Sequence, residues 1–280
     1  MTRTIDRRTF TALSLASTAA LLTGCAHAGP GPQLDSTGRR TGTRTQVTIL
    51  LYPGTTVLDW VGPYEALHRV NGVEVVLAGK TTDIMKSDSG IVAYKANVSL
   101  EEITRTDVLL VPGGAQGMMT AANDPVVANW VKQIDTTSLY TVGICTGSLM
   151  LAHLGLLQGR RATTYWKFSD MLAPAGATFV PERWVKDDKY WTSAGVSTGM
   201  DLTLALIADL YGDKAAMMAQ LAIEYDPHPP YNAGSARTAP ERSSKLWADN
   251  QAIARDRGGG RGLPAPNACE GARSARETAA

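Results

Sequence analysis

Strand-like and helix-like runs alternate along this chain from Gln46 to about Asp213. The strand-like runs are short, apolar and bounded by glycine or proline; they are QVTILLY, VEVVLAG, DVLLVPGG and LYTVGI. Segments between them, such as VLDWVGPYEALHRV (57–70), repeat apolar residues at helical spacing. Because parallel strands need crossover connections, this alternation predicts an α/β fold with a mostly parallel sheet and helices on both faces.

Local signals place several further elements. Asp124 followed by proline predicts a helix over 124–134, with the aspartate as its N-cap. Helical periodicity predicts two more helices, over 146–157 and 198–212. The segment 177–195 predicts a β-hairpin whose polar turn is KDDK.

The N-terminal segment, residues 1–25, predicts export. Its Arg7-Arg8 pair is similar to a twin-arginine signal, and LLTGC resembles a lipobox in which Cys25 is acylated after cleavage. The apolar stretch between them is too short to span a bilayer on its own. Together these signals predict a lipoprotein anchored to the outer face of the cytoplasmic membrane. The alternative is an uncleaved N-terminus in which Cys25 is incidental.

The remainder of the chain divides into a flexible tether (26–44), an α/β domain (45–240) and a tail (241–280) with one polar helix and a disordered end.

The net charge of +1 and the lack of a dense basic block argue against a nucleic-acid partner. The four histidines show no metal-ligand spacing, so we expect no metal.

Cys145 is the strongest candidate for chemistry. If Cys25 is lipidated and Cys269 lies in the tail, no disulfide partner is left and Cys145 is a free thiol. It follows LYTVGI, at the carboxyl end of a predicted strand, where ligands bind in doubly wound sheets. Glycines two residues before and after it permit a sharp strand–nucleophile–helix elbow, and the helix N-terminus is expected to lower the thiol pKa. The alternative is a small buried apolar residue.

The sequence also offers partners for such a nucleophile. Backbone N–H groups of Gly113 and Gly114, with that of Thr146, could form an oxyanion hole, although a tight turn explains the glycines equally well. Asp59 is the first candidate for the acid or base, with helix N-capping as its alternative role. Asp201 either lines the pocket or belongs only to the first turn of its helix.

Two other residues near these motifs are less suited to catalysis. Glu65 is better interpreted as a solvated helix position. His153 lies eight residues beyond the thiol along the predicted helix, and we interpret it as a packing residue.

Five blocks of the chain, within about residues 46–240, resemble the ThiJ/PfpI superfamily of class I glutamine amidotransferase-like proteins, and most of all its isonitrile hydratase branch. The blocks are LYPGTTVLDWVGPYEAL, LLVPGGAQGMM, VGICTGSLMLAHLGLLQGRRATTYW, SAGVSTGMDLTLALIADLYG and LAIEYDPHPPYNAGSARTAP. The resemblance implies a flavodoxin-like three-layer sandwich, a homodimer, a small-molecule substrate and no metal or organic cofactor.

It also implies roles for individual residues. Cys145 would be the nucleophile, Thr146 would help form the active site and Asp59 would handle the proton. Tyr165, in the substrate pocket, stands where many hydratase-like members have histidine. The implied reaction is attack of the Cys145 thiolate on an isocyanide, followed by hydrolysis of the thioimidate to an N-substituted formamide.

The sequence does not exclude two other functions. They are a different activity of the superfamily (glyoxalase or deglycase, amidase or peptidase), and a non-catalytic lipoprotein that senses a ligand or redox state through a low-pKa cysteine.

Overall fold

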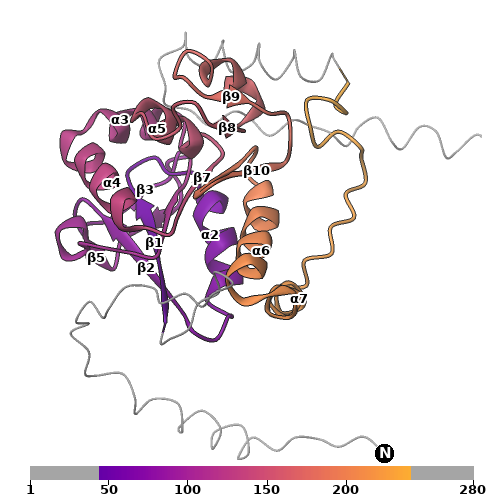
Figure 1. Ribbon diagram of the computed structural model, residues 1–280, viewed down its shortest axis with the longest axis horizontal. Helices are drawn as coiled ribbons and strands as arrows, with labels where there is room; N and C mark the ends of the chain where they lie inside the picture. The colour runs from indigo at the N-terminus through magenta and orange to yellow at the C-terminus, as the bar shows by residue number, and fades with distance from the viewer. Residues whose placement is uncertain (1–43, 241–280) are drawn as a thin grey trace, which may run out of the picture. The chain divides into compact units, whose positions relative to one another are not determined.

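A seven-stranded sheet forms the centre of the domain in the computed structural model, which describes residues 44–240 (Figure 1). Its order is β10-β11-β7-β6-β1-β2-β5, and all neighbouring pairs are parallel except β10 with β11. The strands are β1 (Thr45–Leu51), β2 (Val73–Gly79), β5 (Val98–Ser99), β6 (Val108–Val111), β7 (Tyr140–Ile144), β10 (Trp184–Asp187) and β11 (Tyr190–Ser193).

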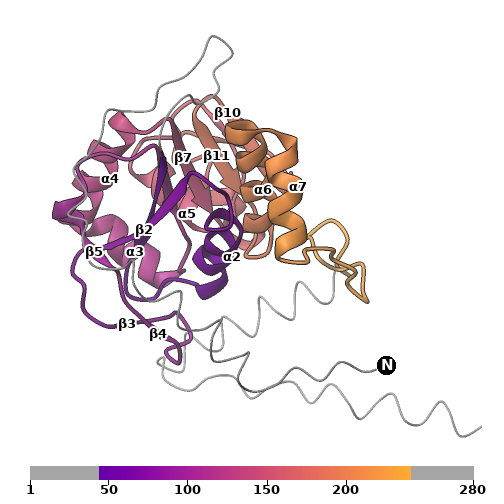
Figure 2. The same cartoon turned by 90° about the horizontal axis from the view of Figure 1, so that it is seen from below.

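Helices cover both faces of this sheet (Figure 2). One face carries α2 (Val57–Leu67) and α6 (Thr198–Tyr211), with α7 (Asp213–Ala222) packed on α6. The other face carries α3 (Gln116–Asn123), α4 (Pro125–Thr137) and α5 (Gly147–His153). The predicted three-layer α/β architecture is therefore confirmed.

The side chains of β6 show how the two cores divide. Leu109 and Val111 pack toward α3, α4 and α5, whereas Val108 and Leu110 pack toward α2 and α6. All four are fully buried. Because successive strand side chains point to opposite faces, a strand covered by helices on both sides must be apolar throughout, which explains the continuous apolar runs in the sequence.

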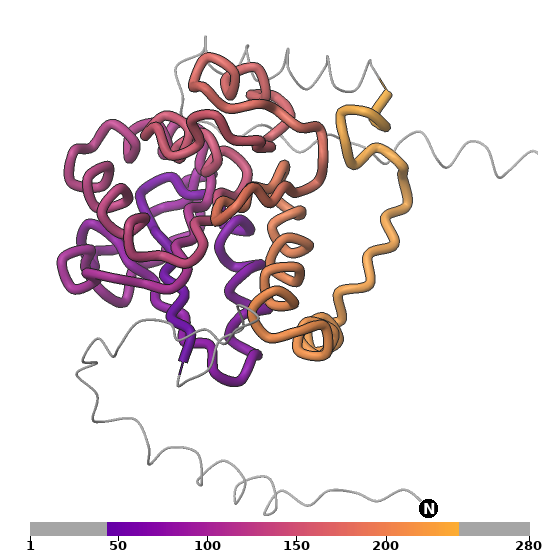
Figure 3. The backbone as a smooth tube through the Cα atoms, in the orientation of Figure 1, coloured from indigo at the N-terminus to yellow at the C-terminus, as the bar shows by residue number. Residues whose placement is uncertain are grey.

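Several short elements had no signal in the sequence. They are the antiparallel pair β3 (Met85–Lys86) and β4 (Ala93–Tyr94), the parallel pair β8 (Arg161–Ala162) and β9 (Thr178–Phe179), and the 3₁₀ turns η1 (Leu100–Glu102) and η2 (Trp166–Met171). The four strands and η1 are only two or three residues long, which is too short to show periodicity. The six-residue η2 is interrupted by the non-helical backbone of Phe168. After α7 the chain runs as an extended, mostly exposed segment to residue 240 (Figure 3).

Local predictions can be compared directly with these elements. Asp124 does cap α4, since its side chain accepts the N–H of Val126 at 2.9 Å. The hairpin predicted over 177–195 is formed by β10 and β11, but it covers only 184–193, because Thr178–Phe179 pairs with β8 instead. The helix predicted over 146–157 is wrong at its C-terminal end: α5 ends at His153, and Gly155 then takes φ 82°. Glycine tolerates this left-handed conformation, which a continuing helix cannot contain.

The predictions for residues 1–43 and 241–280, including the export signal, most of the tether and lipidation of Cys25, lie outside the described residues. Within 44–240, no helix has both the length and the apolar character needed to cross a bilayer.

Candidate active site

Cys145 occupies a sharp turn between β7 and α5. Its φ is 56°, in the left-handed region that residues with a side chain rarely adopt. Two hydrogen bonds hold this backbone: the Cys145 N–H donates to the carbonyl of Ser193 at 3.1 Å, and Thr164 Oγ1 donates to the Cys145 carbonyl at 2.9 Å. A strained residue persists only where its surroundings over-determine it, and such strain concentrates at functional sites. This is the geometry of a nucleophile elbow.

The glycines on either side of Cys145 are required by close backbone packing. A Cβ atom on Gly143 would lie 2.7 Å from Cα of Ser148, and one on Gly147 would lie 2.0 Å from the carbonyl oxygen of Val111. Neither position has room for a side chain. The close packing predicted from the flanking glycines is confirmed.

Asp59 lies in the first turn of α2 and has no exposed surface. The helix begins at Val57 with Thr56 as the N-cap residue, so the alternative in which Asp59 caps the helix is wrong. Instead, Oδ2 of Asp59 accepts the backbone N–H of Gly113 at 2.9 Å, and Oδ1 makes no hydrogen bond within the described residues. A buried carboxyl with one unused oxygen needs an explanation other than helix stability.

Burial controls the proton on this carboxyl. Desolvation raises the pKa of Asp59 to about 8, although the Gly113 N–H and the neighbouring Cys145 thiol both act to lower it. Asp59 therefore keeps its proton at neutral pH. Because Oδ2 accepts from Gly113, the proton is expected on Oδ1, the oxygen that makes no hydrogen bond.

The pKa of the Cys145 thiol differs from the sequence-based prediction. The N–H of Thr146, in the turn that leads into α5, does act to lower the pKa of Cys145. Burial and the negative charge of Asp59 outweigh it, so that the thiol pKa lies well above its usual value. The prediction of a lowered pKa is therefore wrong, because the thiol is only 5% exposed and lies beside an acid.

Thr146 connects the elbow to the loop after β6. Its Oγ1 accepts the N–H of Gly114 at 3.1 Å and that of Ala115 at 3.3 Å. The N–H of Gly113 is already bound to Asp59. Neither glycine N–H is thus free to bind a substrate oxyanion, which argues against the predicted oxyanion role for this pair. In the structure these N–H groups instead hold Asp59 and Thr146 against the loop after β6.

Tyr165 and Asp201 lie in different surroundings. Tyr165 is half-buried beside the elbow, and burial together with the charge of Cys145 raises its pKa. Asp201 pairs with Arg183 through Oδ2 and accepts the hydroxyl of Tyr225 through Oδ1 at 2.7 Å. Both carboxylate oxygens are therefore occupied, which favours the interpretation that Asp201 is structural.

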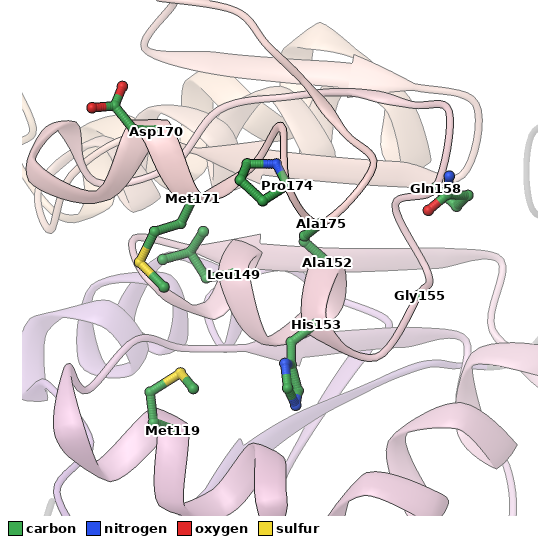
Figure 4. A pocket seen from close by; sticks show the side chains of 10 residues that line it. All are labelled: Met119, Leu149, Ala152, His153, Gly155, Gln158, Asp170, Met171, Pro174 and Ala175. Carbon is green, nitrogen blue, oxygen red and sulfur yellow. The ribbon is translucent and has the colours of Figure 1, made fainter.

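Glu65 and His153 make no contact with Asp59 or Cys145 among the interactions of residues 44–240. Glu65 is partly exposed and pairs with Arg69 on the same helix, as expected for a solvated position. His153 is exposed at the end of α5 rather than packed in the core, so its predicted packing role is wrong. It lines a pocket of about 680 Å³ between α3, α5 and the segment around η2 (Figure 4); the pocket is lined by Met119, Leu149, Ala152, His153, Gly155, Gln158, Asp170, Met171, Pro174 and Ala175.

Sequence reasoning missed several residues of the site. Tyr52 is buried near the pair, and its pKa is raised first by burial and then by the charges of Asp59 and Cys145. It directly follows β1, so the rule that placed Cys145 at a strand end could also have found it. Ser193 follows the same rule at the end of β11, whereas Thr164 lies in an irregular loop where no strand end marks it.

No group of three histidine, cysteine, aspartate or glutamate side chains suited to a metal ion occurs in residues 44–240. The fold and the elbow define an α/β protein with a buried cysteine–carboxyl pair at the carboxyl ends of its parallel strands. The chain belongs to the DJ-1/PfpI family, which matches residues 45–209 and confirms the resemblance seen in the sequence.

Individual relatives are consistent with this family. The chain is 37% identical to an isonitrile hydratase of Pseudomonas putida over 195 residues, which cover 70% of this chain and 85% of the relative. It is 31% identical to an HTH-type transcriptional regulator of Pseudomonas aeruginosa, over 60% of this chain and 52% of the regulator. The crystal structure of a ThiJ/PfpI family protein from Pseudomonas syringae has 33% identity and a TM-score of 0.72, covering 83% of this chain and 95% of that protein.

Proposed function

We propose that this protein is a cysteine-dependent hydratase that converts an isocyanide into an N-substituted formamide. The observation that carries the proposal is the contact between a buried thiol and a buried carboxyl that holds its proton at neutral pH. The relative named isonitrile hydratase supports the choice of substrate class. The terminal carbon of an isocyanide must gain both a nucleophile and a proton, and these two side chains supply them.

The first step forms a covalent intermediate. The sulfur of Cys145 attacks the terminal carbon of R–N≡C, forming a C–S bond, while Asp59 delivers its proton from Oδ1 to the same carbon. The thiol proton passes to Asp59, which regains its starting state. The product is a thioimidate, R–N=CH–S–Cys145, so the S–H bond and one π bond between carbon and nitrogen have been exchanged for one C–S and one C–H bond.

The second step is hydrolysis. Water adds across the C=N bond, so that oxygen binds the carbon and hydrogen binds the nitrogen. Collapse of this tetrahedral intermediate breaks the C–S bond, returns a proton to the sulfur and releases R–NH–CHO. Asp59, protonated again, can give its proton to the nitrogen as it takes one from water, and it can then pass the hydroxyl proton of the tetrahedral intermediate to the sulfur. The sum of both steps is the addition of one water molecule to the isocyanide.

The raised thiol pKa bears on the choice between catalysis and redox sensing. Sensor cysteines carry a low pKa and are accessible, because the thiolate is the form that peroxide oxidises. Cys145 is 95% covered and its pKa is raised by burial and by Asp59. The same pair suits a reaction in which sulfur gives up its proton only as the substrate carbon takes one.

The test is formation of the N-substituted formamide from a simple alkyl isocyanide, followed by NMR. We expect turnover by the wild-type chain and none by Cys145→Ala. A panel with methylglyoxal and a simple amide determines whether another chemistry of the family fits better. Equal rates for wild type and Cys145→Ala, or no formamide from either, would exclude the hydratase function.

A further inference from the structure

A short hairpin, β3–β4 (residues 85–94), is fastened to the loop that leads into α2. The N–H of Gly54 donates to the carbonyl of Lys86 at 2.8 Å, and the N–H of Thr55 donates to the hydroxyl of Tyr94 at 3.0 Å. That hydroxyl in turn donates to the carbonyl of Tyr52 at 2.7 Å. The hairpin is therefore held against the segment that directly precedes Asp59.

Asp88, in the turn of this hairpin, is oriented by three contacts. Its Oδ2 accepts the hydroxyl of Thr56 at 2.6 Å, and its Oδ1 accepts the N–H of Ser89 at 2.8 Å. Its own N–H donates to the carbonyl of Thr55 at 3.3 Å. Because Thr56 is the N-cap residue of α2, the Asp88 carboxylate is fixed at the helix end that carries Asp59.

We propose that Asp88 is a positioning residue whose carboxylate, anchored on Thr56, holds a negative charge at the N-terminal end of the helix that carries Asp59, and that this charge acts on the Asp59–Cys145 pair before a substrate binds. The consequence for turnover rests on the proposed function. The effect on protonation does not, because it is present in the protein without any substrate.

The effect of Asp88 on neighbouring pKa values agrees with its position at the start of α2. The charge of Asp88 acts to raise the pKa of Asp59, of Cys145 and of Tyr52. The other titratable side chains that act on the pair or respond to it are tyrosines, which carry no charge at neutral pH: Tyr52, Tyr94 and Tyr165. Asp88 is therefore the carboxylate outside the pair that acts on both Asp59 and Cys145.

Substitution with asparagine separates the charge from the contacts. In Asp88→Asn the amide oxygen can still accept the N–H of Ser89, and the amide nitrogen can donate to the hydroxyl of Thr56. Asp83→Asn is the matched control. Asp83 is also exposed and also accepts a threonine hydroxyl, that of Thr81 at 2.9 Å, but it makes no contact with Thr56 in the structure.

The experiment measures alkylation of Cys145 by iodoacetamide across a pH series in the full chain, with the Cys145 peptide followed by mass spectrometry. We expect Asp88→Asn to lower the pH midpoint by about 0.3 to 1 pH unit at low salt, because removal of a nearby anion favours the thiolate. Asp83→Asn should keep the wild-type midpoint. An unchanged midpoint in Asp88→Asn, or an equal shift in Asp83→Asn, would overturn the proposal.

The alkylation midpoint at high salt and the midpoint of the Thr56→Val variant provide two further readouts. At about 1 M salt the Debye length falls to about 3 Å, so the wild-type midpoint should move toward that of Asp88→Asn, which itself should move less. Thr56→Val keeps the charge but removes its anchor, so we expect a smaller shift in the same direction. A wild-type midpoint in Thr56→Val would overturn the role of the anchor.

These results are independent of the hydratase assay. If Asp88→Asn lowers the midpoint as expected while no formamide forms with the wild-type chain, the positioning role stands and the hydratase function fails. If formamide forms but the midpoint does not change in Asp88→Asn, the hydratase function stands and the positioning role of Asp88 fails.

Discussion

The N–H of Gly113 donates to Oδ2 of Asp59 at 2.9 Å, and this hydrogen bond joins the loop after β6 to the first turn of α2. The two residues are 54 positions apart in the chain. The bond uses one carboxyl oxygen and leaves Oδ1 beside the site. A Cβ atom on Gly113 would lie 2.7 Å from Oδ2, so only glycine allows this approach. The loop thus orients the acid through Oδ2 and leaves Oδ1 available for proton transfer.

Asp59→Asn should remove most of the activity while keeping the fold. The amide can accept the Gly113 N–H as the carboxyl does, but it cannot donate and regain a proton in the reaction. General acid–base groups contribute about 10²- to 10⁴-fold, and we expect a loss of that size in formamide production. An unchanged rate in a steady-state assay would show that Asp59 is not the proton donor.

The same variant should change how stability depends on pH. The pKa of Asp59 is raised from 3.8 in the reference state to about 8 in the fold. Its contribution to stability is therefore fully present below pH 3.8 and is lost as the pH rises through about 8. The loss is at most about 1.4 kcal/mol per pH unit inside that window.

In Asp59→Asn this loss should disappear, because the amide does not titrate. The free energy of unfolding, measured by urea denaturation at pH 5 and pH 8, should fall less in the variant than in the wild type. Cys145→Ala is the control, since it keeps the acid and should keep most of the pH dependence. Equal pH dependence in wild type and Asp59→Asn would contradict the raised pKa.

Thr146→Val should destabilise the loop that carries the glycine pair, whereas Thr146→Ser should not. The Thr146 hydroxyl oxygen accepts two backbone N–H groups, those of Gly114 and Ala115. Valine has a similar shape but leaves both donors without a partner, at a cost of about 1 to 3 kcal/mol for each buried group. Urea denaturation of the two variants gives the comparison. If serine and valine destabilise the protein equally, the hydroxyl is not the cause.

The sequence predicted the elements whose physical signal is local. Continuous apolar runs indicated the parallel strands, and glycines around Cys145 indicated the elbow. It could not predict the protonation of the pair, because that depends on how deeply Asp59 and Cys145 are buried together by segments distant in the chain. The same reason applies to Asp88: its hydrogen bond to Thr56 spans 32 positions and leaves no pattern in the sequence.

Gly147→Ala should destabilise the protein far more than Gly234→Ala. A Cβ on Gly147 would lie 2.0 Å from the Val111 carbonyl oxygen, which is backbone of the central sheet and has little freedom to move. Overpacking typically costs about 1 to 3 kcal/mol, and we expect a cost at the upper end of that range because the obstructing atom is backbone. Gly234 has no atom within 4 Å of its added Cβ, so we expect a change within about 0.5 kcal/mol. Thermal unfolding measures both, and similar Tm values would mean that the elbow tolerates a side chain.

Asp201→Asn should leave catalysis unchanged and loosen the segment after α7. Asp201 binds Arg183 through one oxygen and the Tyr225 hydroxyl through the other, so its carboxylate fastens that segment to the start of α6. Without the charge both contacts weaken, and limited proteolysis should cut between residues 223 and 240 sooner than in the wild type. Tyr225→Phe removes only the second contact and should have a similar effect on cleavage. A fall in formamide production with unchanged cleavage would instead place Asp201 in the substrate pocket.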